Sequence, residues 1–379
     1  MPDFSRHSVF LWGPRKTGKS FWIKQHLPEA IIIDLLRTDT LAEYVTRPAL
    51  LRERFGTTVP LHNPGPIVID EIQKVPALLD EVHWLIENRA LTFLLTGSSA
   101  RKLRRGHANL LAGRAWRREM KPLCFAEVEE IDIERVMVSG LLPPHFLSPA
   151  PREDLRAYVS DYLREEIIAE GLVSNLPAFS EFLRVAALTS SELLNYTNVA
   201  REVGVSAKVV RSYFEILEDT LLGYRLRPWT RSSRRRLIQA EKFYLFDVGV
   251  TTYLTRRTPR IGTPEFGKSF EHYLFMELLA YRAYRAPELD IRYWRTSTGR
   301  EVDFLLDDQA LAIEVKASAR VHAVDWQSLS ALSEEGLVRQ RIVVSLETQP
   351  REVQDRFGPI MILPWREFLA QLWSGVLLR

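Results

Sequence analysis

The segment from Val9 to Ser20 constrains the fold of this chain more than any other stretch. Its first four residues, Val9 to Trp12, form an apolar run typical of a buried strand, and a helix is expected to begin near Lys19. Between them, the sequence GPRKTGKS satisfies the pattern G-x-x-x-x-G-K-S/T. Glycines let the backbone curl until successive N–H groups point at phosphate oxygens, and the N-terminus of the next helix attracts the same anion. The pattern therefore predicts a strand, a phosphate-binding turn and a helix, in that order.

The chemistry expected at this turn is the binding of a nucleotide together with Mg²⁺. Lys19 would reach the β- and γ-phosphates, and the hydroxyl of Ser20 would ligate the metal ion. The alternative is a chance glycine-rich turn, which the preceding strand and a second motif downstream disfavour. The residues predicted to bind the nucleotide are Gly13, Pro14, Arg15, Lys16, Thr17, Gly18, Lys19 and Ser20.

The second motif is an apolar strand that ends in two acids. Gly65-Pro66 precedes the run Ile67 to Ile69, and Asp70 and Glu71 follow directly. At the carboxyl end of a strand, Asp70 would hold Mg²⁺ and Glu71 would orient or deprotonate the attacking water. The alternative is a strand that happens to end in acids, but the spacing of about 50 residues after a phosphate-binding turn favours the catalytic reading.

Two further strands extend the same pattern. Ala30 to Leu35 predicts a short buried strand, and Leu91 to Thr96 predicts another, after a helix expected from Leu78 to Asn88. Repeated strand–helix units indicate a parallel, doubly wound sheet in which ligands bind at the carboxyl ends of the strands. Ser98 follows the last of these strands, so it is placed to sense the γ-phosphate or the attacking water. A plain turn serine is the alternative.

A basic stretch from Arg101 to Lys121 follows, with eight Lys or Arg residues against one acid, Glu119. Arg114 ends its Leu-Leu-Ala-Gly-Arg segment, and an arginine in such a position can complete a neighbouring subunit's site as an arginine finger. The alternatives are that these side chains face DNA or solvent. Weaker candidates for the same role are Arg101, Arg104 and Arg105.

The segments GPRKTGKS, IVIDEIQ, LLTGSSARKL, LLAGR and KPLCFAEV together resemble AAA+ ATPases of a large prokaryotic family with a C-terminal region of poorly known function. The resemblance covers essentially the whole chain, although that family usually has serine where this chain has Cys124. It implies ATP and Mg²⁺ as cofactors. It also implies a homo-oligomer, a hexamer-like ring, in which active sites form between subunits.

The middle of the chain is expected to hold a helical lid and a winged helix. A proline-rich stretch from Leu142 to Pro151 is interpreted as a linker, and Arg152 to Ala169 has the periodicity of a lid helix. Three helices with a tight turn at Gly204 indicate a helix-turn-helix. Their expected bounds, and those of two strands that would pair as the wing, are 181–188, 197–203, 207–219, 221–227 and 242–246.

Exposed basic residues in this region point to nucleic acid. The loop between the two wing strands carries four arginines without an acid, an electrostatic footprint for phosphates. Acids on the third helix argue against recognition of specific bases. The expected contact is therefore with the phosphate backbone of DNA. A helix-turn-helix that contacts protein is the alternative. The candidate DNA-contacting residues are Lys208, Arg211, Arg231, Arg234, Arg235 and Arg236.

The C-terminal part carries three acids and a lysine on one helix and two strands. A helix expected from Phe266 to Tyr284 carries Glu271, and strands at 291–295, 301–306 and 311–316 follow it. Asp303 and the pair Glu314 and Lys316 lie on the last two strands, and this pattern resembles that of PD-(D/E)xK nucleases. Glu314 and Lys316 are two residues apart and so share one face of a strand, where the carboxylates could bind Mg²⁺ and Lys316 could position water. The fold also hosts inactive copies, so cleavage is left open. Two more strands, 342–346 and 360–363, and a helix, 365–372, complete this α/β part.

Composition sets the broad class. A chain of 379 residues with 46% apolar and 26% charged residues is typical of a globular protein of two or three domains. The single cysteine, Cys124, excludes an intrachain disulfide, and no run approaches the ~20 apolar residues of a membrane span. With no signal-peptide pattern at the start, a cytoplasmic location without membrane contact is expected. The net charge of +3 is too small to argue for nucleic acid by itself.

The sequence thus predicts an α/β protein in three parts: an AAA+ core with a parallel sheet at 1–150, a lid and winged helix at 151–260, and a restriction-endonuclease-like domain at 261–379. The function expected first is an oligomeric ATPase that binds and remodels or translocates along DNA, with nuclease activity open. The second hypothesis is an ATP-dependent switch or remodeller of protein partners, whose nuclease-like domain is catalytically silent and serves for docking.

Overall fold

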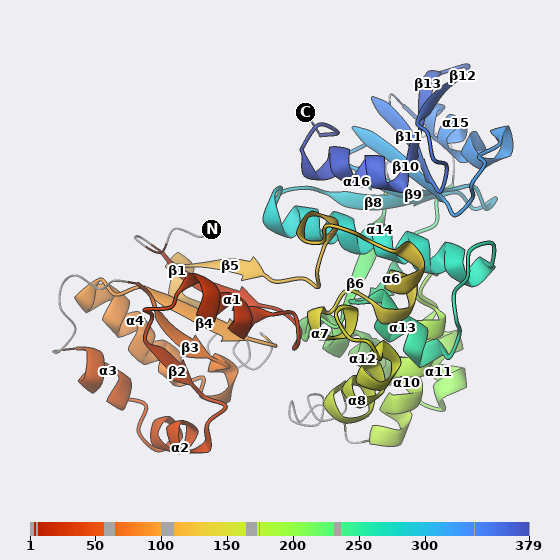
Figure 1. The fold of residues 1–379 in the computed structure, drawn as a ribbon. Coiled ribbons are helices and arrows are strands. Elements are labelled where there is room, and N and C mark those ends of the chain that lie inside the picture. The colour runs from red at the N-terminus through yellow and green to blue at the C-terminus, as the bar shows by residue number, and fades with distance from the viewer. Residues whose placement is uncertain are drawn as a thin grey trace. The chain divides into compact units, whose positions relative to one another are not determined.

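The structure, a computed structural model, describes residues 4, 7–56, 65–99, 110–163, 173, 175–230, 236–336 and 338–378. The chain divides into two compact units (Figure 1). The first comprises Met1–Lys121 with Asp219–Leu222, and the second comprises Pro122–Glu218 with Gly223–Arg379. The predicted division into three parts at residues 150 and 260 stays a prediction.

In the first unit the described strands form a parallel sheet in the order β2-β3-β4-β1-β5. The strand β4 therefore lies between β1, which leads into the phosphate-binding turn, and β3, which ends in the acids. The strands are β1 (Ser8–Trp12), β2 (Ile32–Asp34), β3 (Ile67–Asp70), β4 (Phe93–Gly97) and β5 (Ala115–Glu119). The helices are α1 (Lys19–His26), α2 (Thr38–Thr46), α3 (Leu50–Phe55), η1 (Ile72–Lys74), α4 (Leu78–Arg89) and η2 (Leu110–Gly113).

Alternate residues of the central strands pack on opposite faces of this sheet. Phe10 of β1 and Phe93 of β4 lie in one apolar cluster with Leu85 of α4, whereas Leu11 and Leu94 lie in another with Ile23 of α1. Both faces are therefore covered by helices (Figure 1), which explains why the strands are apolar throughout. A parallel doubly wound sheet was predicted, and the structure confirms it.

Two expectations for the sheet edges were wrong. The predicted buried strand at 30–35 is only three residues long, and Ile31 and Ile32 are 47% and 45% exposed. In the described part of the chain β2 is an edge strand, so no further strand lies beyond it to shield its side chains from solvent. At the other edge, β5 is a strand where the sequence indicated only a basic stretch, because it pairs in parallel with β1.

The second unit is built on a mixed sheet in the order β12-β13-β11-β10-β9-β8-β6-β7. The strands are β6 (Gly223–Pro228), β7 (Lys242–Leu245), β8 (Ile291–Arg295), β9 (Glu301–Leu306), β10 (Leu311–Lys316), β11 (Gln340–Ser345), β12 (Arg351–Asp355) and β13 (Gly358–Pro364). Helices α14 (Pro264–Tyr284) and α16 (Trp365–Trp373) share one apolar cluster with this sheet. Helix α15 (Gln327–Ser333) belongs to the other cluster, with Val302 and Leu305 of β9. The sheet is therefore covered on two faces, as expected of an α/β domain.

Most of the helical region precedes β6, and its last helix, α13, follows β7. Its elements are η3 (Phe125–Glu127), α6 (Ile133–Ser139), α7 (Pro143–Phe146), α8 (Pro151–Ala157), η4 (Tyr158–Leu163), α10 (Leu176–Leu188), α11 (Tyr196–Val203), α12 (Ala207–Asp219) and α13 (Val248–Thr255). The predicted three-helix arrangement is present as α10, α11 and α12. Gly204 has φ 75°, and Ser206 Oγ accepts a hydrogen bond from Val209 N at 3.3 Å, so the turn and cap are those expected.

Two features of the middle region differ from the prediction. The proline-rich stretch is not a linker, because Leu142 and His145 are fully buried and the prolines begin short helices. The two expected wing strands do pair with each other, as β6 and β7, but β6 also pairs in parallel with β8. They therefore belong to the same sheet as the nuclease-like strands. Among the described residues, no helix is long and apolar enough to cross a membrane.

Candidate functional site

The phosphate-binding turn is closed by contacts within the first unit. Gly13 N donates to the carbonyl of Gly97, at the end of β4, over 3.2 Å, and Gly18 has φ 99°, a backbone angle that favours glycine. Lys19 Nζ donates to the carbonyls of Gly13 at 2.6 Å and Pro14 at 3.0 Å. Lys19 is thus folded back over its own loop, with its ammonium at the loop that would surround the phosphates.

The predicted metal ligands lie together. Ser20 Oγ is 3.3 Å from Asp70 Oδ2, although the two residues come from α1 and β3. Asp70 Oδ1 accepts a hydrogen bond from the hydroxyl of Thr96 on β4, which fixes the carboxylate. A hydroxyl and a carboxylate are hard oxygen donors, and Mg²⁺ completes its shell with waters and phosphate oxygens. These residues therefore fit a magnesium ion bound with a nucleotide.

Glu71 is held in an unusual backbone conformation next to this pair. Its φ of 62° lies in the left-handed region, which a non-glycine residue seldom adopts, and its N–H donates to Thr96 Oγ1 at 3.2 Å. The side chain is buried and accepts a hydrogen bond from Nε2 of Gln73. Strain of this kind gathers at functional sites, where surrounding contacts maintain it.

No role was predicted for Gln73 from the sequence. Its Nε2 also donates to Ser98 Oγ at 3.2 Å, so one amide joins the predicted base to the predicted sensor. The signal that could have found it is an amide side chain two residues after Glu71, directly behind the strand that ends in the two acids. The geometry brings Glu71, Gln73 and Ser98 together at the carboxyl edge of β3 and β4.

Arg114 follows η2 and pairs with Glu87 of α4 through its Nε. Both side chains are partly exposed, so this ion pair lies at the surface of the first unit, where its worth is small. Arg114 can therefore leave Glu87 at little cost. The other three arginines considered for this role, Arg101, Arg104 and Arg105, lie outside the described residues.

The four residues of the nuclease-like pattern come from α14, β9 and β10, as predicted. Asp303 Oδ2 accepts a hydrogen bond from Val315 N at 2.8 Å, and Lys316 Nζ donates to Glu314 Oε1 at 2.6 Å. Burial and the charge of Glu271 raise the pKa of Asp303 to about 7. Burial and the charge of Asp303 raise the pKa of Glu314 well above its usual range. The structure thus gathers these side chains, and their burial raises the pKa values of Asp303 and Glu314.

Two residues absent from the prediction, Lys242 and Glu301, also belong to this cluster. Lys242 Nζ lies 2.9 Å from Glu271 Oε1, contacts Glu301 Oε1 and is 4.0 Å from Asp303 Oδ1. In the part of the chain that the structure describes, no group of three or more His, Cys, Asp or Glu side chains is placed to hold a metal ion. The cluster does not fit Mg²⁺ in this arrangement, contrary to the expectation for its carboxylates.

The predicted DNA-contacting residues are only partly described. Lys208 and Arg211 are exposed on α12, and the guanidinium of Arg211 lies 5.0 Å from the ring centroid of Tyr196. Arg236 is exposed after β6. The positions of the remaining three, Arg231, Arg234 and Arg235, lie outside the described residues.

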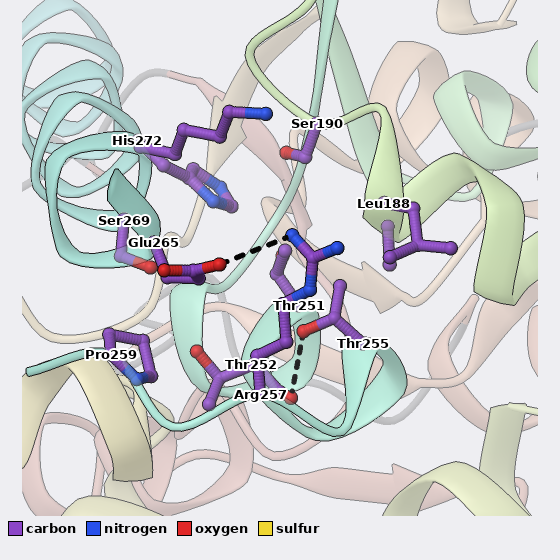
Figure 2. A pocket seen from close by; sticks show the side chains of 12 residues that line it. Leu188, Ser190, Thr251, Thr252, Thr255, Arg257, Pro259, Glu265, Ser269 and His272 are labelled. Atoms are coloured by element: carbon purple, nitrogen blue, oxygen red, sulfur yellow. Dashed lines mark hydrogen bonds and ion pairs between the residues drawn. The ribbon is translucent and has the colours of Figure 1, made fainter. Parts of the chain in front are cut away.

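A small cavity lies between α10, α13 and α14 (Figure 2). Its lining includes Arg257, whose Nη1 is 3.7 Å from Glu265 Oε1, and the buried His272. Burial lowers the pKa of His272 to about 4, so its neutral ring donates from Nε2 to the Leu245 carbonyl at 2.6 Å. The cavity volume is about 40 Å³, space for two or three waters rather than a nucleotide.

Residues 5–129 match the family model described as an AAA domain. The rest of the chain matches two models described as domains of unknown function, DUF8612 over residues 130–260 and DUF4143 over residues 266–368. The fold, the phosphate-binding turn and the paired Ser20 and Asp70 agree with the first match. The N-terminal part is therefore an ATP-binding P-loop domain of the AAA type.

Two curated relatives are the uncharacterized proteins Mb2031c of Mycobacterium bovis and Rv2008c of Mycobacterium tuberculosis. Each is 26% identical over 290 residues, which is 74% of this chain and 64% of the relative. The chain thus spans just under two thirds of the length of these relatives.

Two solved structures are also similar in part. The ORC2 protein of Aeropyrum pernix is 12% identical, with coverage of 67% of this chain and 89% of that chain and a TM-score of 0.25. A signal transduction ATPase with numerous domains from Pyrococcus horikoshii is 12% identical, with coverage of 74% and 45% and a TM-score of 0.19. At such low scores neither likeness contributes to the assignment.

Proposed function

We propose that this chain hydrolyses Mg·ATP at the carboxyl edge of the first sheet. The observation that carries the proposal is the convergence of Ser20 with Asp70, and of Glu71 with Ser98 through Gln73. When bound, Mg²⁺ would neutralise developing charge on the phosphates, and Ser20 and Asp70 would hold it.

The other roles in the reaction are assigned to side chains of the protein. Lys19 exchanges the carbonyls of its loop for phosphate oxygens, Glu71 accepts the proton of the attacking water, and Ser98 donates to the γ-phosphate or to that water. The exchange by Lys19 leaves no charge uncompensated, because an ammonium pairs better with phosphate than with a carbonyl. Gln73 orients Glu71 and Ser98 relative to each other.

The test is ATP turnover and nucleotide binding by the full chain and by Lys19→Ala. Turnover that Lys19→Ala abolishes, with weaker ATP binding, supports the proposal. A matched control is Lys24→Ala on the same helix, an exposed lysine that should leave turnover unchanged. Equal turnover in the wild type and Lys19→Ala would refute the assignment of this turn as the active site.

We further propose that the ATPase works as a homo-oligomer, a ring in which Arg114 of one subunit completes the site of the next. The ion pair between Arg114 and Glu87 lies at the surface and is weak. Arg114 can therefore leave Glu87 and enter the active site of the next subunit. The resemblance to ring-forming AAA+ proteins supports an oligomer. Light scattering with and without ATP measures whether assembly occurs.

DNA is the partner proposed first. The support is the exposure of Lys208, Arg211 and Arg236 on the second unit. Affinity for duplex, branched and single-stranded DNA should fall steeply with salt, and one of them should stimulate ATP turnover. Absence of both effects would refute this partner.

The alternative partner is protein, with the C-terminal sheet as a docking platform. The specific observation in its favour is the buried ammonium of Lys242, which pairs with Glu271 and Glu301 of the nuclease-like cluster. Co-purification of one stoichiometric protein, free of nucleic acid, would favour this alternative over DNA.

A further inference from the structure

The nuclease-like cluster contains a buried positive charge, the ammonium of Lys242. Lys242 is the first residue of β7, and it is only 1% exposed. An ionised lysine is almost never buried unless acids surround it. Here the acids come from two other elements, Glu271 from α14 and Glu301 and Asp303 from β9.

The geometry around the ammonium is that of a coordinated cation. Nζ lies 2.9 Å from Glu271 Oε1, contacts Glu301 Oε1 and stands 4.0 Å from Asp303 Oδ1. The hydroxyl of Tyr244, two residues along β7, donates to the same Glu271 oxygen at 2.6 Å. The ammonium thus pairs closely with the carboxylates of Glu271 and Glu301, and Asp303 stands at the limit of an ion pair.

The acids of the cluster have further partners within the protein, although Oε2 of Glu314 has no hydrogen-bond partner among the described residues. Lys316 Nζ donates to Glu314 Oε1 at 2.6 Å, and Arg295 Nη1 lies 2.5 Å from Glu301 Oε2. Asp303 Oδ2 accepts from Val315 N at 2.8 Å. A divalent ion entering among these carboxylates would face the buried ammonium of Lys242 at close range, and like charges repel strongly where water is excluded.

We infer that the ammonium of Lys242 replaces the divalent cation of a nuclease site, so that the C-terminal sheet holds its carboxylates together without metal and does not cut DNA. Hydrolysis of a phosphodiester at such a site needs a metal-activated water. The cluster instead ties β7, α14 and β9 into one rigid body. This inference concerns the second unit alone and stands whether or not the P-loop hydrolyses ATP.

The test locates metal ions by Fe²⁺ cleavage. Full-length chain with Mg²⁺ replaced by Fe²⁺, in the presence of ATP, ascorbate and peroxide, is cut at the backbone wherever Fe²⁺ binds. Fragments ending near Asp70 report the P-loop site and act as the internal control. We expect none ending near Asp303 or Glu314 in the wild type, and no Mg²⁺- or Mn²⁺-dependent nicking of plasmid DNA.

The variant Lys242→Met removes the ammonium and keeps the length of the side chain. Folded Lys242→Met should gain fragments near Asp303 and Glu314, whereas Lys268→Met, which removes a surface lysine paired with Glu192, should not. Wild-type fragments at these positions, or wild-type nicking that Asp303→Ala abolishes, overturn the inference. A folded Lys242→Met without the new fragments overturns it too. If Lys242→Met does not fold, the wild-type fragments and nicking decide.

Discussion

The hydroxyl of Ser20 lies 3.3 Å from Oδ2 of Asp70, fifty residues further along the chain. The contact arises because β1 and β3 run parallel and end at the same edge of the sheet, with β4 between them. Thr96 at the end of β4 donates to the other oxygen of Asp70. Three strands thus fix the two side chains that would hold Mg²⁺.

Removal of the Ser20 hydroxyl should weaken the metal site without disturbing the fold. For Ser20→Ala we expect roughly a tenfold or larger increase in the Mg²⁺ concentration needed for half-maximal ATP turnover, since one oxygen ligand is lost. A Mg²⁺ titration of turnover measures it. Nucleotide binding without Mg²⁺ should be unchanged, and an unaltered Mg²⁺ dependence would remove Ser20 from the ligand set.

Gln73 is expected to act as a positioning residue. In Gln73→Met, Glu71 and Ser98 lose their shared donor, so kcat should fall about tenfold with little change in KM, because ground-state binding of ATP does not use the amide. The pH dependence of kcat should shift as Glu71 loses a hydrogen bond. Its exposed neighbour provides the control: Lys74→Met should leave kcat and its pH profile unchanged. A rise in KM together with the fall in kcat would indicate a structural role instead.

Complementation between variants tests whether Arg114 acts on a neighbouring subunit. Arg114→Ala and Glu71→Gln should each lose roughly 10²- to 10⁴-fold in turnover. A mixture of the two should recover part of it, because mixed assemblies contain some interfaces with both intact residues. The exposed Arg117→Ala should not lose activity. Mixtures no more active than either variant would place Arg114 outside the shared site.

Asp247 is expected to be a major stability determinant of the second unit. Its fully buried carboxylate accepts from Leu141 N at 2.8 Å and caps α13 through Val250 N at 3.0 Å. Asp247→Ala leaves both N–H groups without these acceptors, so the free energy of unfolding should fall by about 2–4 kcal/mol. Urea unfolding measures it. The exposed Glu215→Ala on α12 should change stability by less than about 0.5 kcal/mol.

Stability should depend on pH through Glu277. Burial raises the pKa of Glu277 to about 7 from the ordinary 4.5, although Phe125 N and Trp373 Nε1 donate to its oxygens. Between these two pH values the folded state keeps a proton that the unfolded state has lost. The free energy of unfolding should therefore decrease as pH rises through this window, by a total on the order of 3 kcal/mol.

The comparison with Glu277→Gln isolates this contribution. The variant should show a smaller decrease between pH 5 and pH 7.5 in thermal unfolding, at the cost of one hydrogen bond. Asp303 and Glu314, whose pKa values burial also raises, keep their part of the decrease in both proteins. The low pKa of His272 has the opposite effect on the free energy of unfolding, because burial disfavours the charged form of the ring. This effect is the same in the wild type and in Glu277→Gln. Parallel pH profiles for the wild type and Glu277→Gln would contradict the prediction.

Local patterns sufficed for much of the fold. The apolar runs that became β1, β3 and β4, and the helices α11 and α12, were expected close to their observed bounds, because period and capping residues are properties of neighbouring positions. Helix α10 begins five residues before its expected start at residue 181. The edge strands of the first sheet were harder to predict. β5 is basic and Ile32 of β2 is largely exposed, since an edge strand follows from pairing with a distant partner and not from its own composition.

The sequence by itself determined that this chain has a phosphate-binding turn followed by two acids, because those features are contiguous and their chemistry needs adjacent residues. Tertiary structure alone decided which side chains those acids meet. Gln73 reaches Ser98 only because β3 and β4 are neighbours, and Lys242 reaches Glu271 and Glu301 only because β7 packs in the same unit as α14 and β9. Side chains far apart in sequence become partners through strand pairing and burial, so a buried ammonium lies among acids for which a metal ion was expected from the sequence.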